Sequence, residues 1–350
     1  MSLSFLGFSP FFRDAWQALS EPSLVPARVL RGEPAPIRVQ SAGGDALASL
    51  AGRLRESEQG AIVAGDWVAL DERNLVVRRT LPRRTAFVRR AAGRSARPQV
   101  VAANFDVAFV VMGLDQNFNL HRLERYLALA HASGAEPVVL LTKAALAPSR
   151  DRQIHDAEAI ARSAAVHAID VVAGMSTHVP GQYLGEGRTA ALLGSSGVGK
   201  STLLNYLLGR DEVRTAPARA RDDKGRHITT HRELFQLPAG GCIIDTPGMR
   251  ELALWCDDDA LRATFDDVAG FAAQCRFRDC RHRDEPGCDV QRAIEGGLLD
   301  PDRAESFHKL QREMQQGREQ RRTWERRAKE RLGGRITREA VRRKYGRDGS

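Results

Sequence analysis

The chain has 350 residues, of which 42% are hydrophobic and 28% are charged, and its formal net charge is +9. This composition supports the buried cores of two or three domains. The longest apolar run, Val107–Leu114, is far shorter than the ~20 residues of a membrane-spanning helix. The N-terminus lacks the basic start and unbroken apolar run of a signal peptide, and five cysteines do not make a disulfide framework. We therefore expect a cytoplasmic protein that does not span a membrane.

Residues 1–98 predict an extension followed by a small barrel. Residues 1–22 form the extension, with one short amphipathic stretch, and short alternating runs separated by turn residues fill residues 23–98. Strands at this spacing favour an OB-type β-barrel. The expected strands are Ala27–Leu30, Ile37–Gln40, Ala61–Leu70 and Leu75–Arg79. Eight arginines at positions 78, 79, 83, 84, 89, 90, 94 and 97 suit an oligonucleotide-binding surface, and equally a solvated strand face.

Residues 99–256 alternate buried apolar runs with helical patterns, which predicts a parallel α/β sheet. The expected strands are Val107–Met112, Pro137–Leu141, Ala168–Ala173, Thr189–Leu193, Leu234–Leu237 and Cys242–Ile244. The expected helices are His121–Ala132, Asp156–Ala165 and Ser201–Leu208. No internal repeat is visible.

A phosphate-binding loop follows the strand Thr189–Leu193 and fits the pattern G-x-x-x-x-G-K-[ST] between a strand and a helix. Its residues are Gly194, Ser195, Ser196, Gly197, Val198, Gly199, Lys200 and Ser201, with Thr202 after them. The glycines let backbone N–H groups and the helix N-terminus face a phosphate. Lys200 would contact the β- and γ-phosphates, and the Ser201 hydroxyl would bind Mg²⁺. A chance glycine-rich turn explains the pattern far less well.

A second segment, Cys242–Gly248, delivers Asp245 at the end of an apolar strand, 45 residues after Lys200. Asp245 would bind Mg²⁺ directly or through water, and the backbone N–H of Gly248 would reach the γ-phosphate. This combination indicates a GTPase switch rather than a general ATPase. Met249 stands where many GTPases carry a glutamine that orients water, so intrinsic hydrolysis should be slow unless another loop or a partner assists.

Between these segments, Gly225–Thr230 fits the first switch of a GTPase. Such a switch needs a threonine whose hydroxyl completes the Mg²⁺ shell and whose amide senses the γ-phosphate. Thr229 or Thr230 would serve. His227 would replace the missing glutamine, although an ordinary loop histidine is an equally good interpretation.

The base-recognition pattern [NT]-K-x-D has one counterpart, the segment Thr142-Lys143-Ala144-Ala145, directly after an apolar strand. Thr142 and Lys143 would contact the nucleotide. The segment precedes the phosphate loop along the chain, an order that implies a circularly permuted GTPase domain at residues 99–256. Permutation is tolerated because the same sheet forms when the termini are joined elsewhere.

A cluster of three cysteines and one histidine predicts a structural zinc site. Cys275, Cys280, His282 and Cys288 lie within fourteen residues. They supply the full ligand set of a closed tetrahedral Zn²⁺ site, with no position left for a catalytic water. Scattered reduced cysteines are the weaker alternative. The cluster interrupts a helical domain expected at residues 257–334, and Cys242 and Cys256 are expected to be ordinary buried side chains.

The C-terminal end is strongly basic. Residues 311–350 carry twelve Arg and two Lys against six acidic residues, a net charge of +8. This concentration favours a polyanionic partner, nucleic acid first and an anionic membrane second. A solvated helix with Arg and Glu paired along its faces is the alternative. We treat residues 335–350 as a separate basic tail.

The order and wording of these motifs resemble the small-ribosomal-subunit biogenesis GTPases of the RsgA type, over roughly residues 24–310. The resemblance rests on GDWV (65–68), LPRR (81–84), AANFD (102–106), RLERYL (122–127), GSSGVGKSTLLN (194–205), GRHITTHREL (225–234), IIDTPGMREL (243–252) and CRFRDCRHRDEPGCDV (275–290). It implies an N-terminal OB barrel, a permuted GTPase domain and a zinc-bearing helical domain with the four Cys and His ligands named above. It also implies a late assembly factor that binds the immature small subunit and its rRNA, is stimulated by the subunit, and leaves when GTP is hydrolysed.

The chain departs from the family pattern in base recognition. Ala145 stands where the family has an aspartate that accepts two hydrogen bonds from guanine, and the next acid, Asp151, lies too far along the chain to replace it. Loss of this hydrogen-bond acceptor should weaken the binding of GTP by ~2–4 kcal/mol and remove much of the preference for guanine. In the second base-contacting loop, Val171–Ala173 replaces the usual serine. We therefore expect intact phosphate and Mg²⁺ chemistry with relaxed guanine specificity.

The leading hypothesis is a monomeric, ribosome-dependent GTPase that hydrolyses GTP to GDP and phosphate and holds rRNA through its barrel and arginine tail. One alternative is a nucleotide-gated RNA-binding protein with little or no turnover. Another is an NTPase of relaxed specificity that acts on a different nucleic acid. Turnover measured with and without small subunits separates the three.

Overall fold

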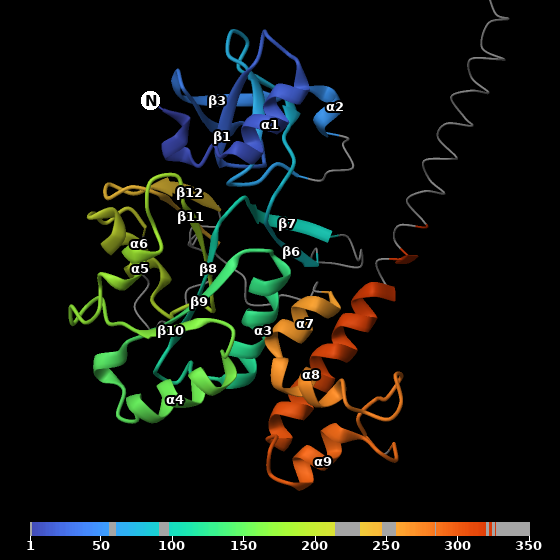
Figure 1. Ribbon diagram of the computed structural model, residues 1–350. Coiled ribbons are helices and arrows are strands. Elements are labelled where there is room, and N and C mark those ends of the chain that lie inside the picture. The colour runs from blue at the N-terminus through green and yellow to red at the C-terminus, as the bar shows by residue number, and fades with distance from the viewer. Residues whose placement is uncertain are drawn as a thin grey trace, which may run out of the picture.

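The computed structural model describes residues 2–55, 61–90, 98–213, 232–246, 257–283 and 285–319, together with residues 322, 323 and 326. The chain forms three parts in sequence order: an N-terminal barrel, a central α/β part and a C-terminal group of helices (Figure 1). Within these residues, no helix is both long enough and apolar enough to cross a bilayer.

The barrel predicted from the sequence is present and consists of five strands, one more than the four expected. The strands are β1 (Val25–Arg31), β2 (Ile37–Ser41), β3 (Gly44–Leu50), β4 (Trp67–Asp71) and β5 (Val76–Thr80), with a short helix α2 (Gly52–Arg55) after β3. Strand β1 pairs with both β2 and β4, and β3 pairs in parallel with β5, so the sheet closes on itself. Fully buried Val29, Ile37, Val68 and Val77 fill the interior.

The N-terminal extension packs against the barrel. It contains the 3-10 helix η1 (Leu3–Leu6) and the helix α1 (Pro10–Leu19). The rings of Phe8 and Phe12 lie 4.7 and 5.8 Å from the ring of Trp67, measured between centroids. The amphipathic stretch predicted from the sequence therefore covers the indole of the barrel.

A buried arginine ties the extension, the barrel and the α/β part together. Arg28 of β1 donates hydrogen bonds to the carbonyl oxygens of Leu6 (2.8 Å) and Asn104 (2.6 Å). Burial lowers the pKa of its guanidinium to about 10. The neighbouring thiol of Cys242 is also buried, which raises its pKa to about 11 and keeps it protonated at neutral pH. Cys242 is thus an ordinary buried side chain, as expected, while Cys256 lies outside the described residues.

An antiparallel hairpin of β6 (Ala86–Arg90) and β7 (Pro98–Ala103) leads into the central sheet. The order of the central strands is β10-β9-β8-β11-β13-β12, and only β12 is antiparallel to its neighbour. Their bounds are β8 (Val107–Gly113), β9 (Glu136–Thr142), β10 (Ala165–Ala168), β11 (Thr189–Leu193), β12 (Glu233–Gln236) and β13 (Cys242–Asp245). Alternate residues of β8 enter two separate buried clusters, so both faces of the sheet are covered, which explains its continuous apolar runs.

Four helices cover the two faces of this sheet. Helices α3 (Leu120–Ala132) and α4 (Arg150–Ile160) contribute side chains to the cluster on one face. Helices α5 (Val179–Gln182) and α6 (Lys200–Leu208) contribute to the cluster on the other. A further 3-10 helix, η2 (Ala144–Leu146), follows β9.

Strand β12 joins the central sheet to the barrel. Arg31 of β1 pairs with Glu233 of β12, and the guanidinium of Arg38 lies 2.9 Å from the carboxylate of Glu233. Since β12 begins three residues after Gly225–Thr230, the barrel contacts an element that follows the predicted first switch closely along the chain.

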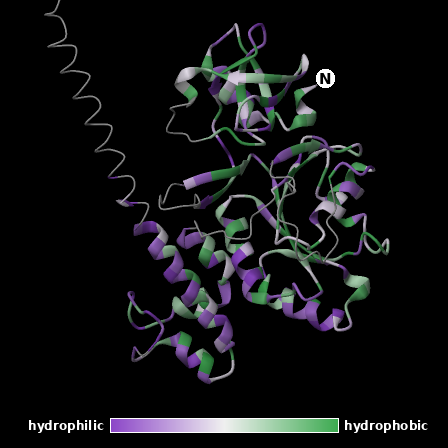
Figure 2. Ribbon diagram, turned by 180° about the vertical axis from the view of Figure 1, so that it is seen from behind, coloured by the Kyte–Doolittle hydropathy of each residue, from purple (hydrophilic) through white to green (hydrophobic). Residues whose placement is uncertain are grey.

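The C-terminal part contains α7 (Asp258–Thr264), α8 (Asp266–Ala272), α9 (Asp289–Glu295) and a helix over residues 301–319. Their mixed hydrophilic and hydrophobic colouring in Figure 2 is that of amphipathic helices around one core. Phe265, Val268, Leu310 and Met314 form that core, and Ala128 of α3 packs into it. The helical part therefore docks on the helix that follows β8.

Three predicted elements have wrong boundaries. The strand expected at Ala61–Leu70 is β4, Trp67–Asp71, and residues 61–66 before it form no strand. The helix expected at Asp156–Ala165 runs from Arg150 to Ile160, with Asp151 in its first turn, where an acidic side chain is favourable. The strand expected at Ala168–Ala173 is instead β10, Ala165–Ala168, and the residues after it turn away from the sheet. The short, half-exposed strands β3, β6 and β7 were missed.

Candidate functional site

The phosphate-binding loop lies between β11 and α6, as its motif predicts. A side chain at Gly194 would meet the carbonyl oxygen of Val111 at 2.3 Å, so only glycine lets the loop leave the sheet here. Gly197 and Gly199 have φ angles of 80° and 96°, which also favour glycine. Loop residues 194–199 therefore turn tightly and end at the N-terminus of α6, the geometry that favours bound phosphate.

Lys200 and Asp245 lie close enough to interact. The ammonium of Lys200 donates to the carbonyl oxygens of Gly194 (2.7 Å) and Ser195 (2.6 Å), which holds it over the loop. Asp245 ends β13, the parallel neighbour of β11, and is 6% exposed. Burial raises the pKa of its carboxyl group, and the charge of Lys200 opposes that rise. Thr246 donates a hydrogen bond to the carbonyl oxygen of Leu192 and so anchors the end of β13 to β11.

Ser201 and Thr202 lie in the first turn of α6, and Asp245 is the last residue of β13. The Ser201 hydroxyl and the Asp245 carboxylate therefore come from two elements that meet at the same edge of the sheet. A hydroxyl and a carboxylate are oxygen ligands of the kind that Mg²⁺ takes, alongside phosphate oxygens and waters. The residues present therefore fit Mg²⁺. His227, Thr229, Thr230, Gly248 and Met249 lie outside the described residues.

The base-recognition segment lies against the phosphate loop, as the permuted order requires. The hydroxyl of Thr142 donates to the carbonyl oxygen of Val198 at 2.6 Å. Lys143, in a left-handed conformation (φ 60°), donates to the carbonyl oxygen of Gly197 and to the carboxylate of Asp115, each at 2.7 Å. These bonds join two segments that are more than fifty residues apart in the sequence.

Asp115 was missed by the sequence analysis. Hydrogen bonds and the charge of Lys143 lower the pKa of its carboxyl group despite partial burial. Asp115 lies two residues after β8, at the same sheet edge as the phosphate loop, and this position in the sequence could have identified it as a candidate site residue. Arg122 of α3 was also missed, and its guanidinium lies 3.5 Å from the Ser195 hydroxyl.

The structure places a second missed acid, Asp170, beside Ala145. One carboxylate oxygen of Asp170 accepts a hydrogen bond from the backbone N–H of Ala145 at 3.2 Å. The other accepts from the N–H groups of Val172 (3.1 Å) and Ala173 (3.0 Å). Asp170 is 5% exposed and follows β10, the parallel neighbour of β9. A carboxylate thus stands next to the position where the family aspartate is missing.

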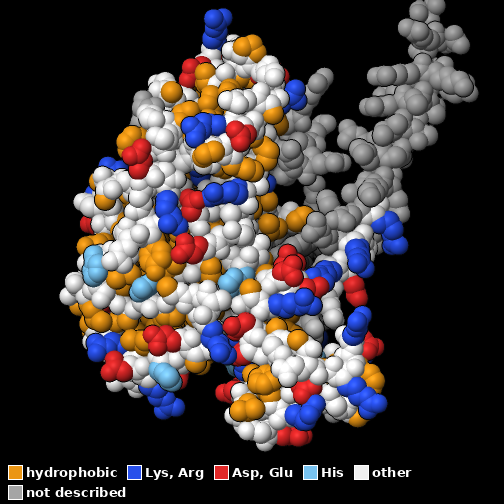
Figure 3. Space-filling view, in the orientation of Figure 1, with side chains coloured by type: hydrophobic (Ala, Val, Ile, Leu, Met, Phe, Trp, Pro, Cys, Tyr) orange, Lys and Arg blue, Asp and Glu red, His pale blue; other side chains and the backbone are white. Residues whose placement is uncertain are grey.

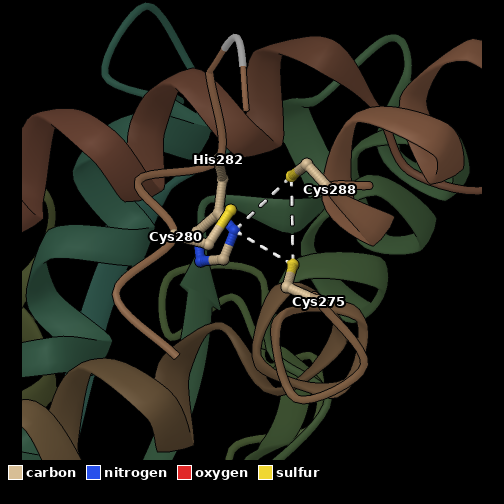
Figure 4. Close-up of side chains that lie close together, drawn as sticks. All are labelled: Cys275, Cys280, His282 and Cys288. Atoms are coloured by element: carbon tan, nitrogen blue, oxygen red, sulfur yellow. Dashed lines mark hydrogen bonds between the residues drawn. The ribbon is translucent and has the colours of Figure 1, made fainter. Parts of the chain in front are cut away.

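The four predicted zinc ligands converge in the C-terminal part (Figure 4). Cys275 follows α8 and Cys288 caps the start of α9, while Cys280 and His282 come from the intervening loop. The ligand atoms all lie within 4.8 Å of one another. His282 has a φ of 58°, a left-handed turn in the middle of the loop.

The distances within this cluster fit a tetrahedral ion. The Nδ1 atom of His282 lies 3.4 Å from the sulfur of Cys275 and 3.6 Å from that of Cys288, and the two sulfurs are 3.9 Å apart. Zinc bonds of ~2.0–2.3 Å in tetrahedral geometry separate ligand atoms by ~3.5–3.8 Å. The cluster is therefore compatible with a zinc ion.

Glu285 organises the loop that carries Cys280 and His282. Its carboxylate accepts hydrogen bonds from the backbone N–H groups of Arg283 (2.9 Å) and Arg281 (3.0 Å). These bonds lower the pKa of Glu285 to about 2.

A cavity of about 780 Å³ lies elsewhere, between α3, α4 and the C-terminal helices. Its lining includes Asp156, Asp266, Asp300 and Asp302, and part of the hollow between these elements is visible at the lower edge of Figure 3. The six Asp and Glu residues of the lining outnumber its two arginines, Arg162 and Arg303, so the cavity would repel the phosphates of a nucleotide.

The chain matches the family model described as RsgA GTPase over residues 80–255. The small ribosomal subunit biogenesis GTPase RsgA of Opitutus terrae is 46% identical over 329 residues, which cover 89% of this chain and 90% of that protein. The protein of the same name from Syntrophotalea carbinolica is 42% identical over 327 residues, 90% of each chain. That from Xanthomonas campestris is 44% identical over 313 residues, 86% of this chain and 84% of its own.

Two solved structures share the fold. YjeQ from Thermotoga maritima superposes with a TM-score of 0.63 at 25% identity, covering 83% of this chain and 98% of its own. YloQ, described as a circularly permuted GTPase, superposes with a TM-score of 0.59 at 23% identity, covering 84% and 96%. The predicted circular permutation is therefore confirmed, in agreement with the position of β9 before β11 along the chain.

Proposed function

The chain belongs to the RsgA GTPase family, and on that premise we propose that it hydrolyses GTP to GDP and phosphate on the small ribosomal subunit, late in its maturation. One observation carries the assignment of the site: Lys143 of the base segment bonds to Gly197 of the phosphate loop at 2.7 Å. This contact joins the base and phosphate segments at one sheet edge, where Asp245 also lies.

We assign the phosphates to the loop that begins at Gly194. Its backbone N–H groups face the anion, and Lys200 neutralises charge on the β- and γ-phosphates. Ser201 and Asp245 would hold Mg²⁺, which supplies further neutralisation of the triphosphate. The full nucleotide-contacting set is Thr142, Lys143, Gly194, Ser195, Ser196, Gly197, Val198, Gly199, Lys200, Ser201, Thr202 and Gly248.

The switch residues complete the proposed chemistry. Thr229 or Thr230 contacts the γ-phosphate and the Mg²⁺ shell, and His227 positions the attacking water in place of a glutamine. Because Met249 has no hydrogen-bonding group suited to water, turnover depends on a group supplied by another loop, for which we propose His227, or by a partner.

We propose that Cys275, Cys280, His282 and Cys288 bind one structural Zn²⁺. The ion would hold together the loop between α8 and α9, where few apolar side chains are available. The Cys₃His donor set and the separations of its atoms support this assignment.

We propose that the barrel is of the OB type and that it contacts rRNA together with the basic tail at residues 335–350. The curated relatives are named for biogenesis of the small ribosomal subunit. On the face shown in Figure 3, Lys and Arg alternate with Asp and Glu over the described parts, so no one-sign patch dominates it. Residues 311–350 hold a net charge of +8 and would supply most of the attraction to phosphates.

We further propose domain boundaries after residues 22, 98, 256 and 334, a monomeric state, and a cytoplasmic location away from membranes. Family membership does not favour the alternatives of a protein without turnover or of an NTPase with relaxed specificity.

GTP turnover measured with and without purified small subunits tests the proposal. We expect slow release of phosphate by the protein alone and strong stimulation by small subunits, weakening steeply as salt is raised. Lys200→Ala should remove both activities. Binding without turnover under either condition, or equal stimulation by unrelated RNA, would contradict the proposal.

A further inference from the structure

The missing aspartate at Ala145 leaves the base pocket without its expected acceptor. A guanine base presents two neighbouring donors, N1–H and the exocyclic amino group, and a carboxylate is the side chain that accepts both. Strands β9 and β10 are parallel neighbours, with Leu141 opposite Ala168. Loops that follow neighbouring parallel strands meet at one sheet edge, so a side chain after β10 can reach the space next to Ala145.

From this juxtaposition we propose that Asp170 reads guanine in this chain, in place of the aspartate that Ala145 replaces. This inference rests on the proposed function, which places the base beside Thr142 and Lys143. The carboxylate lies 3.2 Å from the backbone nitrogen of Ala145, so the adjacent loop places an acidic group beside the position of the missing aspartate.

The environment of Asp170 suits an acceptor for a base. Asp170 is 5% exposed, and within the described part of the chain no cation forms a salt bridge with it. Three backbone N–H groups fix its carboxylate, and a carboxylate has about four acceptor positions. The bond from Ala145 is the longest of the three, at 3.2 Å, and is the one that an entering base would share.

Two exposed apolar side chains flank this contact. Leu146, next to Ala145, is 82% exposed, and Val172, two residues after Asp170, is 89% exposed. Large apolar side chains so exposed in both loops are suited to covering the faces of a planar base. Together with the stem of Lys143, these side chains would cover the ring of a base whose donor edge meets the carboxylate.

The substitution Asp170→Asn tests the proposal. Asparagine keeps an oxygen for the N–H groups of Val172 and Ala173, while its amide group faces Ala145 and the base as a donor. The amino group of guanine would then face the amide of asparagine, and both are hydrogen-bond donors. Xanthine has a carbonyl at C2 instead, which would accept the new hydrogen bond. We expect GTP affinity to fall at least tenfold, XTP affinity to rise, and the preference between them to reverse.

A residue that only caps its loop gives a different result. Asp170→Asn would then weaken GTP, ATP and XTP equally, or leave all three unchanged, and either outcome overturns the proposal. The double variant Ala145→Asp with Asp170→Ser returns the carboxylate to the family position and should bind GTP with wild-type preference. Asp170→Ser alone should lose that preference.

Asp151→Asn is the matched control, because the Asp151 side chain is 88% exposed and lies outside the pocket. It should leave all three affinities unchanged. Failure of this inference is distinguishable from failure of the proposed function. A wild-type chain that binds GTP, but with a GTP-to-XTP ratio that Asp170→Asn does not alter, contradicts only the inference. A wild-type chain that binds no nucleoside triphosphate contradicts both.

Discussion

Arg303 and Glu124 form a buried ion pair that joins the C-terminal helices to the α/β part. Their charged atoms are 2.8 Å apart, and their side chains are only 6% and 2% exposed. Arg303 also bonds to Asp267 at 3.1 Å and lies over the ring of Phe265, 4.3 Å from its centroid. Glu124 belongs to α3, whose Arg122 reaches Ser195 of the loop before α6, so one helix contacts both that loop and the C-terminal helices.

Replacement of Arg303 by methionine should destabilise the protein by ~3–5 kcal/mol, because Glu124 would remain buried without its cation. Urea unfolding measures the loss. The matched control is Arg318→Met, which breaks a solvent-exposed pair with Asp258 and should cost no more than ~1 kcal/mol. Similar losses in the two variants would show that the buried pair does not hold the parts together.

Lys143→Ala should weaken the binding of GTP and GDP alike. The ammonium holds the base segment on the phosphate loop through Gly197 and Asp115, and hydrogen bonds of a charged group contribute ~1.5–3 kcal/mol. We expect an affinity loss of ~10–100-fold in equilibrium titrations with fluorescent nucleotides. Lys309→Ala, a surface change on the C-terminal helix, serves as the control. Unchanged affinity in Lys143→Ala would argue against the proposed base position.

Asp245→Asn should stabilise the nucleotide-free protein at pH 7 and abolish the additional stability given by Mg²⁺ with GTP. Burial raises the pKa of Asp245, so the folded state binds its proton more tightly than the unfolded state. That contribution is complete below the ordinary value of 3.8 and is lost as the pH rises through the raised pKa. A gain of ~1 kcal/mol raises Tm by ~2–4 °C in a chain of several hundred residues.

The pH dependence supplies the control for Asp245. As the pH falls and the wild-type carboxyl group takes up its proton, the difference in Tm between wild type and Asp245→Asn should shrink. A difference that grows at acidic pH, or a variant that still gains stability from Mg²⁺ with GTP, contradicts the assigned role.

Cys280→Ser should reduce the zinc content below one ion per chain and destabilise the C-terminal helices, because a structural zinc site contributes directly to folding. Metal analysis and thermal unfolding before and after chelation measure both effects. Cys242→Ala, at a buried thiol outside the cluster, should keep the full zinc content. Wild-type protein that purifies without zinc and is indifferent to chelator would refute the site.

The local motifs could be found in the sequence because each requires particular residue types at short, fixed distances along the chain. The phosphate loop needs glycines at fixed offsets, and the Cys and His residues of the cluster lie within fourteen positions. The permuted order also followed from the sequence, since a single base-recognition segment precedes the loop. Long apolar runs such as Val107–Met112 marked the buried strands well.

Contacts that depend on tertiary structure were not predictable. Asp170 was overlooked because distance along the chain was used to judge which acid could replace the missing aspartate, whereas the sheet brings neighbouring loops together. Asp115 and Arg28 act through partners far away in the sequence, at Lys143 and Asn104. Strand β3 alternates small and exposed residues and so lacks a strong apolar signal.

A crystal structure with Mg²⁺ and a non-hydrolysable GTP analogue tests the central claim most directly. The account predicts the β- and γ-phosphates against the loop ending at Lys200, the ion between Ser201 and Asp245, and the guanine beside Lys143 with its donor edge at Asp170. A nucleotide bound elsewhere, or an ion without Ser201 and Asp245 among its ligands or their bridging waters, would contradict it.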